Sequence, residues 1–172
     1  MTEKKVTGVL QSDWSAVIQD YPIASGWTHD GGALVVCDSA GGVYVFDTKV
    51  GELLWSERCA HEGGALAMSM HPVQTGFATA GQDGKILIWG LSEARPRCCI
   101  EIGSGWVENL LWSPDGAQLA SSHGREIQIF AADGTEQWRS DEHLSTVSAL
   151  GWLNSEEVVS TCYGRVTIFD AA

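Results

Sequence analysis

Thr79-Ala-Gly-Gln-Asp-Gly-Lys-Ile-Leu-Ile-Trp89 predicts two short strands joined by a tight turn. Asp83-Gly84 is a strong hairpin signal, because glycine accepts the positive φ that tight hairpin turns require. The apolar run 85–89 is rich in strand-forming residues and suits a strand that is buried on both faces. Residues 76–80, before the turn, are also short and apolar. A lone hairpin is only marginally stable, so this pair needs further strands or a packing partner.

Three features of this stretch and its surroundings recur about every 40 residues. The aromatic residue that closes the hairpin recurs as Phe46, Trp89, Phe130 and Phe169. An earlier residue recurs as Trp27, Met70, Trp112 and Trp152, and a turn follows it at 28–31, 71–74, 113–116 and 153–156. Three features in phase predict four repeating units, and no helical period competes with them.

The repeat resembles the WD-repeat family of β-propellers. The residues that carry the resemblance are Trp112-Ser-Pro-Asp-Gly116, Leu119-Ala-Ser-Ser122 and Asp83-Gly-Lys-Ile-Leu-Ile-Trp89. A period of about 40 to 45 residues with four strands per unit is the signature of that family. The resemblance covers essentially the whole chain. It implies an all-β fold, a β-propeller built of four-stranded antiparallel blades, with four WD-like repeats in the chain.

The chain is predicted to form a single repeat domain over residues 1–172. An outer strand is expected at about 4–14, followed by blade units at about 15–58, 59–102, 103–141 and 142–172. Within the units, strands are predicted at 23–27, 33–37, 43–46, 52–55, 65–70, 77–80, 85–89, 97–102, 107–112, 118–121, 126–130, 136–138, 147–152, 158–162 and 166–169.

The fourth unit lacks an outer strand, whereas an outer strand without a blade precedes the first unit. Propellers of this family commonly close by joining two such parts. Four units are few for that family, so three arrangements stay open. Two chains could exchange outer strands and form an eight-bladed homodimer, the chain could be a fragment of a longer protein, or it could close alone as a small ring.

The family has a buried hydrogen-bond set made of a histidine, a serine or threonine, an aspartate and a tryptophan. The resemblance assigns this structural set to His61, Thr79, Asp83 and Trp89. The other units depart from it, because phenylalanine replaces the tryptophan and has no N–H to donate. At the place of the aspartate they have Ala40, His123-Gly124 and Tyr163-Gly164. Those blades are therefore expected to depend mainly on apolar packing.

Composition limits the classes of function. The chain is 44% hydrophobic and 19% charged, which is typical of a globular protein. Its formal net charge of −12 disfavours nucleic-acid binding, which depends on Lys and Arg. No apolar run is long enough to predict a membrane span. The five cysteines are odd in number and irregularly spaced, which predicts a reducing, cytoplasmic compartment.

No motif for catalysis or for cofactor binding stands out. There is no G-x-S-x-G elbow, no P-loop and no dinucleotide fingerprint. Cys98-Cys99 is the most metal-like feature, but it lies on a predicted strand and has no zinc-ligand spacing around it. We therefore expect no catalytic, metal-binding or cofactor-binding residues. His61 is expected to be structural, and His29 and His71 are expected to lie on the surface.

These observations favour a non-enzymatic scaffold that binds a protein or peptide partner, which is also what the family resemblance implies. Candidate contact residues lie on the expected loops: Trp14, Tyr21, His29, Asp30, Trp106, Arg125, Glu142, His143 and Tyr163. Trp14 and Trp106 are the strongest candidates, because aromatic residues often anchor interfaces; wedging between blades is the alternative role for them. Two other functions stay open: a half-propeller or engineered module without its own activity, and a metal-handling or catalytic propeller that uses cysteine and histidine.

Overall fold

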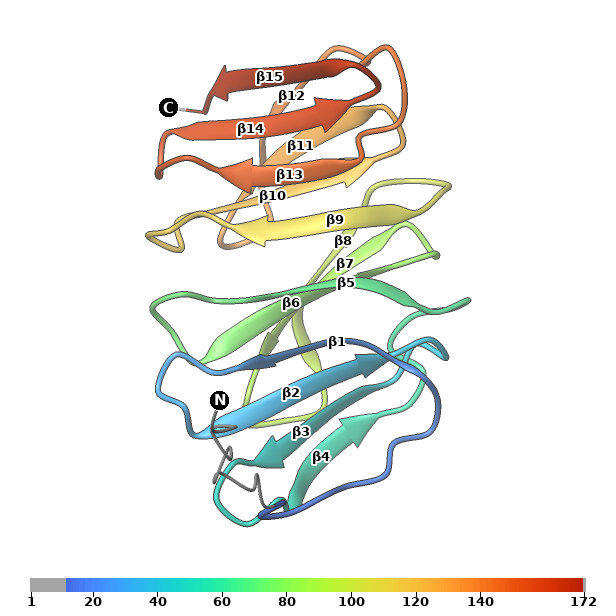
Figure 1. Cartoon of the computed structure of the whole chain (residues 1–172), viewed down its shortest axis with the longest axis vertical. Helices are drawn as coiled ribbons and strands as arrows, with labels where there is room; N and C mark the ends of the chain where they lie inside the picture. The colour runs from blue at the N-terminus through green and yellow to red at the C-terminus, as the bar shows by residue number, and fades with distance from the viewer. Residues whose placement is uncertain (1–11, 172) are drawn as a thin grey trace, which may run out of the picture.

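The computed structural model describes residues 12–171. These residues form an all-β fold with four antiparallel sheets, each of which is one blade of a propeller (Figure 1). The fold class predicted from the sequence is confirmed. The predicted outer strand at about 4–14 falls mostly outside the described residues. No helix in residues 12–171 is long and apolar enough to cross a membrane.

Three blades have four strands, and the described part of the fourth has three. Blade 1 contains β1 (Pro22–Trp27), β2 (Ala33–Asp38), β3 (Val43–Asp47) and β4 (Leu53–Glu57). Blade 2 contains β5 (Ala65–Met70), β6 (Gly76–Gly81), β7 (Lys85–Gly90) and β8 (Pro96–Glu101). Blade 3 contains β9 (Val107–Trp112), β10 (Gln118–His123), β11 (Glu126–Ala131) and β12 (Glu136–Arg139). Blade 4 contains β13 (Ala149–Trp152), β14 (Glu157–Cys162) and β15 (Arg165–Asp170).

Each strand pairs with the next one in the chain, which makes every blade a simple meander. All the strands lie within two residues of their predicted ends. The agreement follows from the sequence pattern, since short β-branched runs alternate with turns that contain glycine.

Glycine is required at the turn of the stretch that decides the fold. Gly84 has a φ of 69°, which favours glycine over any other residue. A Cβ atom at this position would lie 2.0 Å from the carbonyl oxygen of Gly103. The turn is further fixed by Asp83, whose Oδ1 accepts a hydrogen bond from the Lys85 N–H at 3.2 Å. Both the backbone conformation and the neighbouring loop therefore exclude a side chain here.

The blades stack in chain order as an arc rather than a closed ring. Their inner strands β1, β5, β9 and β13 follow one another along the stack, and Figure 1 places blades 1 and 4 at opposite ends. Three clusters of buried apolar residues fill the spaces between blades 1 and 2, 2 and 3, and 3 and 4. Among the described residues, no such cluster joins blade 4 to blade 1. Each end of the arc therefore presents a sheet without a neighbouring sheet.

Candidate functional site

Blade 2 contains a continuous chain of buried hydrogen bonds. Trp89 Nε1–H donates to Thr79 Oγ1 at 2.9 Å, and Thr79 Oγ1 lies 2.9 Å from His61 Nε2. His61 Nδ1 lies 3.0 Å from Asp83 Oδ1. Because a carboxylate only accepts hydrogen bonds, His61 carries its proton on Nδ1, and Nε2 accepts from the Thr79 hydroxyl. Burial lowers the pKa of His61, which favours this neutral form. The set therefore ties the β6–β7 turn and the loop before β5 to the centre of blade 2.

Blade 4 contains a second histidine of the same kind. His143 Nε2 lies 2.9 Å from Ser160 Oγ, and Ser160 is the counterpart of Thr79 in strand order. His143 Nδ1–H donates to the carbonyl oxygen of Arg125 at 2.9 Å, in place of the missing aspartate. His143 is buried. The expectation that His143 contacts a partner from a loop is therefore wrong, because both ring nitrogens are used inside the fold.

Blades 1 and 3 lack this histidine. In blade 3 the hydroxyl of Ser121, the counterpart of Thr79, is buried and has no hydrogen-bond partner. In blade 1 a different buried group, Asp38, takes over. It accepts hydrogen bonds from the N–H groups of Ala40 and Gly42, at 3.1 and 2.7 Å, and from the Tyr44 hydroxyl at 2.9 Å. The sequence pattern did not predict a role for Asp38, because the repeat places the acid two residues later, at Ala40.

His71 is also buried, which corrects its expected place on the surface. Its Nε2–H donates to the Gly116 carbonyl oxygen at 3.1 Å, and its Nδ1 accepts from the N–H groups of Val73 and Gln74. Its ring packs on Trp112, with the centroids 4.7 Å apart. The turn after β5 folds back over blade 3, so a polar residue in a predicted turn becomes a link between two blades.

The remaining candidate contact residues lie in different places. Trp106 is 53% exposed in the loop before β9, and Tyr163 is 89% exposed at the β14–β15 turn. His29 is exposed beside β1, and Arg125 forms an ion pair with Glu142 near the β10–β11 turn. Trp14 is half-buried against blade 1. Of these residues, Arg125 of blade 3 contacts His143 of blade 4, and Tyr163 lies at the β14–β15 turn of blade 4.

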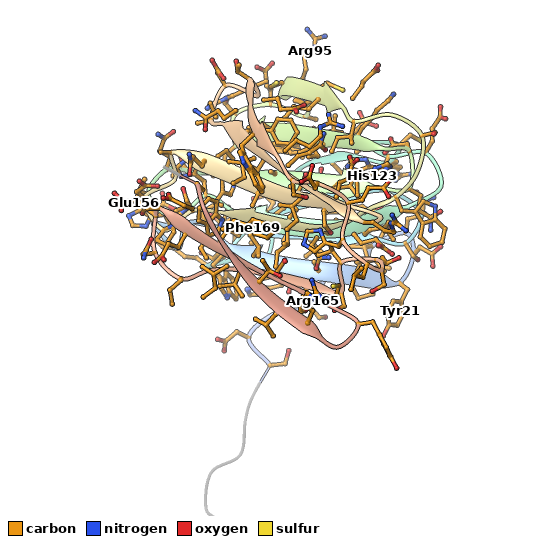
Figure 2. All side chains as sticks on the ribbon, turned by 90° about the horizontal axis from the view of Figure 1, so that it is seen from above. Tyr21, Arg95, His123, Glu156, Arg165 and Phe169 are labelled. Carbon is orange, nitrogen blue, oxygen red and sulfur yellow. The ribbon has the colours of Figure 1, made fainter. Side chains whose placement is uncertain are left out.

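The open face of blade 4 carries two exposed apolar side chains on β15. Val166 is 69% exposed and Ile168 is 56% exposed. Figure 2 views the molecule from this end, with β15 and its Arg165 and Phe169 near the viewer. Isolated apolar residues on a surface are common, but these two follow a pattern that the other blades share.

The same two positions are buried in the other blades. Strand register makes Val166 and Ile168 the counterparts of the pairs Val43 and Val45, Ile86 and Ile88, and Ile127 and Ile129. All six of those side chains are buried. β15 therefore has the sequence of a strand that another blade covers.

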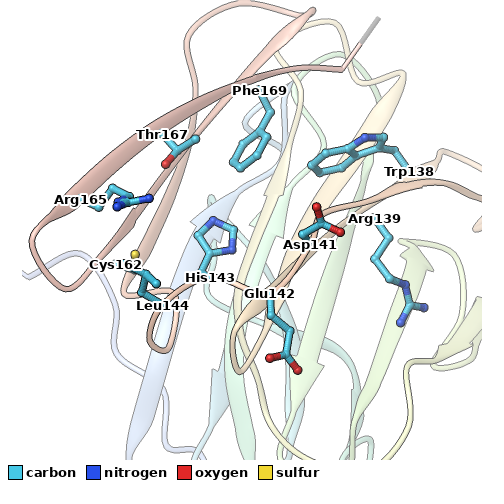
Figure 3. A pocket seen from close by; sticks show the side chains of 10 residues that line it. All are labelled: Trp138, Arg139, Asp141, Glu142, His143, Leu144, Cys162, Arg165, Thr167 and Phe169. Carbon is cyan, nitrogen blue, oxygen red and sulfur yellow. The ribbon is translucent and has the colours of Figure 1, made fainter.

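A hollow of about 410 Å³ lies beside β15, at the outer side of blade 4 (Figure 3). Trp138 and Phe169 form part of its wall and pack on each other, with ring centroids 5.2 Å apart. Arg165 and Thr167 of β15 and Glu142 of the preceding loop line it as well. The hollow combines an aromatic wall with polar strand-edge residues, so it suits an extended peptide segment better than a small apolar molecule.

All five cysteines are free thiols. Burial raises the pKa of Cys37 to about 11, and burial also raises the pKa of Cys98. In the part of the chain that the structure describes, no three side chains of His, Cys, Asp or Glu are placed to hold a metal ion.

Comparison with known proteins agrees with this architecture. The family model described as "WD domain, G-beta repeat" matches residues 53–90. The p21-activated protein kinase-interacting protein 1-like of Danio rerio is 32% identical over 129 residues, which are 74% of this chain and 34% of that protein. WD repeat-containing protein 1 of Bos taurus is 26% identical over 104 residues, which are 59% of this chain and 17% of that protein. The chain thus spans about a third or less of the length of these relatives.

Two solved structures share the fold. "Structure of U3-55K" matches with a TM-score of 0.80 and 18% identity, over 90% of this chain and 50% of that one. "Crystal Structure of Mitotic Checkpoint Complex" matches with a TM-score of 0.76 and 23% identity, over 88% of this chain and 48% of that one. In both cases this chain corresponds to about half of the solved chain.

Proposed function

Because this chain belongs to the WD-repeat β-propeller family, we propose that it is a non-enzymatic protein-interaction scaffold that completes its propeller by pairing with a second copy of itself. Rigid sheets that hold exposed loops and edges make a good platform for protein partners. The five free thiols support a reducing compartment such as the cytoplasm.

One observation carries the proposal of self-association: Val166 and Ile168 are exposed where three other blades bury the same pair. Fully burying a Val or Ile side chain contributes about 1.5–3 kcal/mol. The two residues are roughly 60% exposed, so covering them in both copies would contribute about 4–7 kcal/mol. An apolar face of this kind favours association over exposure to water.

The other end of the arc offers a matching surface. Blade 1 has an apolar groove of about 550 Å³, to which Leu34, Val36 and Phe46 contribute. In a two-fold dimer, blade 4 of each copy would meet blade 1 of the other, so both ends would be covered at once.

The test is the absolute mass in solution, measured by light scattering after size exclusion. The chain of 18.5 kDa should give a single species of about twice that mass. Ile168→Asp should give a monomer, because a carboxylate at this place could not be buried without a partner. Val73→Asp is the matched control, since Val73 is similarly exposed but lies in a turn of blade 2, and it should stay dimeric. A wild-type protein that is monomeric at every concentration would overturn self-association.

A further inference from the structure

Trp14 lies on blade 1 in an unusual way for a residue that precedes the first sheet. Its ring packs on Phe46, with the centroids 6.2 Å apart. Its Nε1–H donates to the carbonyl oxygen of Thr48 at 3.0 Å. Phe46 is the aromatic residue that closes the third strand of the blade, and Thr48 lies two residues after it.

Trp55 makes the same contacts one blade later. It packs on Trp89, with the centroids 5.9 Å apart, and its Nε1–H donates to the carbonyl oxygen of Leu91 at 2.7 Å. Trp89 closes the third strand of blade 2, and Leu91 again lies two residues after it. Trp138 likewise packs on Phe169 of blade 4.

Trp55 and Trp138 belong to outer strands, β4 and β12, and each packs on the blade that follows its own. Trp14 therefore stands where the outer strand of a blade preceding blade 1 would place its tryptophan. The spacing is similar, because Trp55 lies ten residues before the β5 start at Ala65 and Trp14 lies eight residues before the β1 start at Pro22. The contacts of Trp14 thus place residues 12–16 where an outer strand would lie, although these residues form no strand and no other strand of such a blade is present beside them in the described chain.

Blade 4 shows the complementary gap. In the described chain β15 pairs only with β14, so its other edge has no strand beside it. Unpaired backbone groups along a sheet edge bind an added strand. The hollow beside Arg165 and Thr167 lies along this edge (Figure 3).

The other blades set the register that would fill the gap. Trp55 is paired with Val45, and Trp138 is paired with Ile129. Val45 and Ile129 are the counterparts of Ile168 on β15. By the same register, Trp14 would pair with Ile168, and Ser15 would pair with Thr167.

We propose that residues 12–16 of a second copy add to β15 as the fourth strand of blade 4, with Trp14 opposite Ile168. This inference rests on the proposed self-association and specifies its contact. The donor is a second copy, because Trp14 is held on blade 1 while β15 lies at the opposite end of the arc (Figure 1). Each strand would then pair with one copy and dock its tryptophan on the other.

Engineered disulfides test the register directly. Cross-strand partners have Cα atoms about 4.5–5.5 Å apart, which a disulfide can bridge. In a background where Cys59, Cys98 and Cys99 are replaced by serine, Ser15→Cys with Thr167→Cys should oxidise to a covalent dimer on non-reducing gels. Neither substitution alone should give a covalent dimer. Asp13→Cys with Thr167→Cys is the register control, because residues two positions out of register lie about 7–8 Å apart and should not cross-link.

Light scattering on tryptophan variants gives a second readout. Trp14→Ala should raise the dissociation constant of the dimer by about tenfold or more, because it removes the half-buried aromatic ring that holds residues 12–16 on blade 1. Trp106→Ala, an exposed tryptophan elsewhere in the chain, should leave the dimer unchanged.

The outcomes separate this inference from the proposal on which it rests. A dimer by light scattering in which the Ser15→Cys, Thr167→Cys variant forms no disulfide, or forms one within a single chain, would overturn the strand exchange and leave self-association intact. A monomeric wild type would overturn both. A covalent dimer that forms only when Ser15→Cys and Thr167→Cys are present together would support both the strand exchange and the self-association.

Discussion

Thr79→Val is the substitution that most sharply tests the role of the buried hydrogen-bond set. Valine has nearly the shape of threonine, so the change removes the hydroxyl and little else. Thr79 Oγ1 is the shared partner of Trp89 Nε1 and His61 Nε2, both at 2.9 Å. The substitution therefore leaves a buried indole N–H and a buried imidazole nitrogen without a partner.

The expected loss of stability follows from these two groups. Each buried polar group without a partner costs about 1–3 kcal/mol, so the variant should lose about 2–6 kcal/mol of unfolding free energy. For a chain of this size, that corresponds to a fall in Tm of about 4–24 °C. The packing of Trp89 on Phe77, with centroids 5.9 Å apart, should be retained, so the blade should still fold.

Blade 3 supplies a matched control. Ser121 occupies the same strand position as Thr79 and is equally buried, but its hydroxyl has no partner. Ser121→Ala should therefore leave stability unchanged or raise it slightly. Urea unfolding followed by both circular dichroism and tryptophan fluorescence would measure each variant. A Thr79→Val protein within about 0.5 kcal/mol of the wild type, or an equal loss in both variants, would refute the reasoning.

Three further predictions rest on other parts of the fold. Burial lowers the pKa of His61 and His71 from 6.5, so below that pH the unfolded chain binds protons that the folded chain does not. The urea midpoint should therefore fall as the pH drops from about 7.5 to 5.5. The double variant His61→Asn, His71→Asn should show a weaker dependence of the urea midpoint on pH, and an unchanged dependence would contradict this reasoning. His71→Ala should cost about 2 kcal/mol of unfolding free energy, because it removes three hydrogen bonds and a ring contact. His29→Ala, at an exposed site, should change thermal stability little. Equal losses in the two variants would show that His71 does not link two blades. Since burial raises the pKa of Cys37 to about 11, a thiol reagent should modify exposed Cys59 quickly and Cys37 only after unfolding. Mass spectrometry of the labelled peptides would show this, and rapid labelling of Cys37 in the folded protein would contradict its burial.

Local sequence determined the strands and the turns of this protein. The run from Lys85 to Trp89 is apolar and β-branched, and Asp83-Gly84 can adopt only a few backbone conformations, so the hairpin follows from residues that are close in the chain. Repetition of that pattern was enough to predict an all-β propeller. The position of His61 was also within reach, because the other members of its set lie in the same repeat.

The tertiary structure alone decided which side chains are buried by a neighbouring blade. The sequence pattern predicts that His71 and His143 lie in exposed loops. In the structure, His71 forms a hydrogen bond to Gly116 of the next blade, and His143 forms one to Arg125 of the previous blade. The docking of Trp14 on blade 1 likewise depends on tertiary contacts, which match those of Trp55 on blade 2. Strand formation depends on neighbours along the chain, whereas burial depends on how the sheets stack, and residues far apart in sequence meet only after stacking. For the same reason the sequence determined that Val166 and Ile168 belong to a strand, and only the stacked arc showed that they lie on an open face.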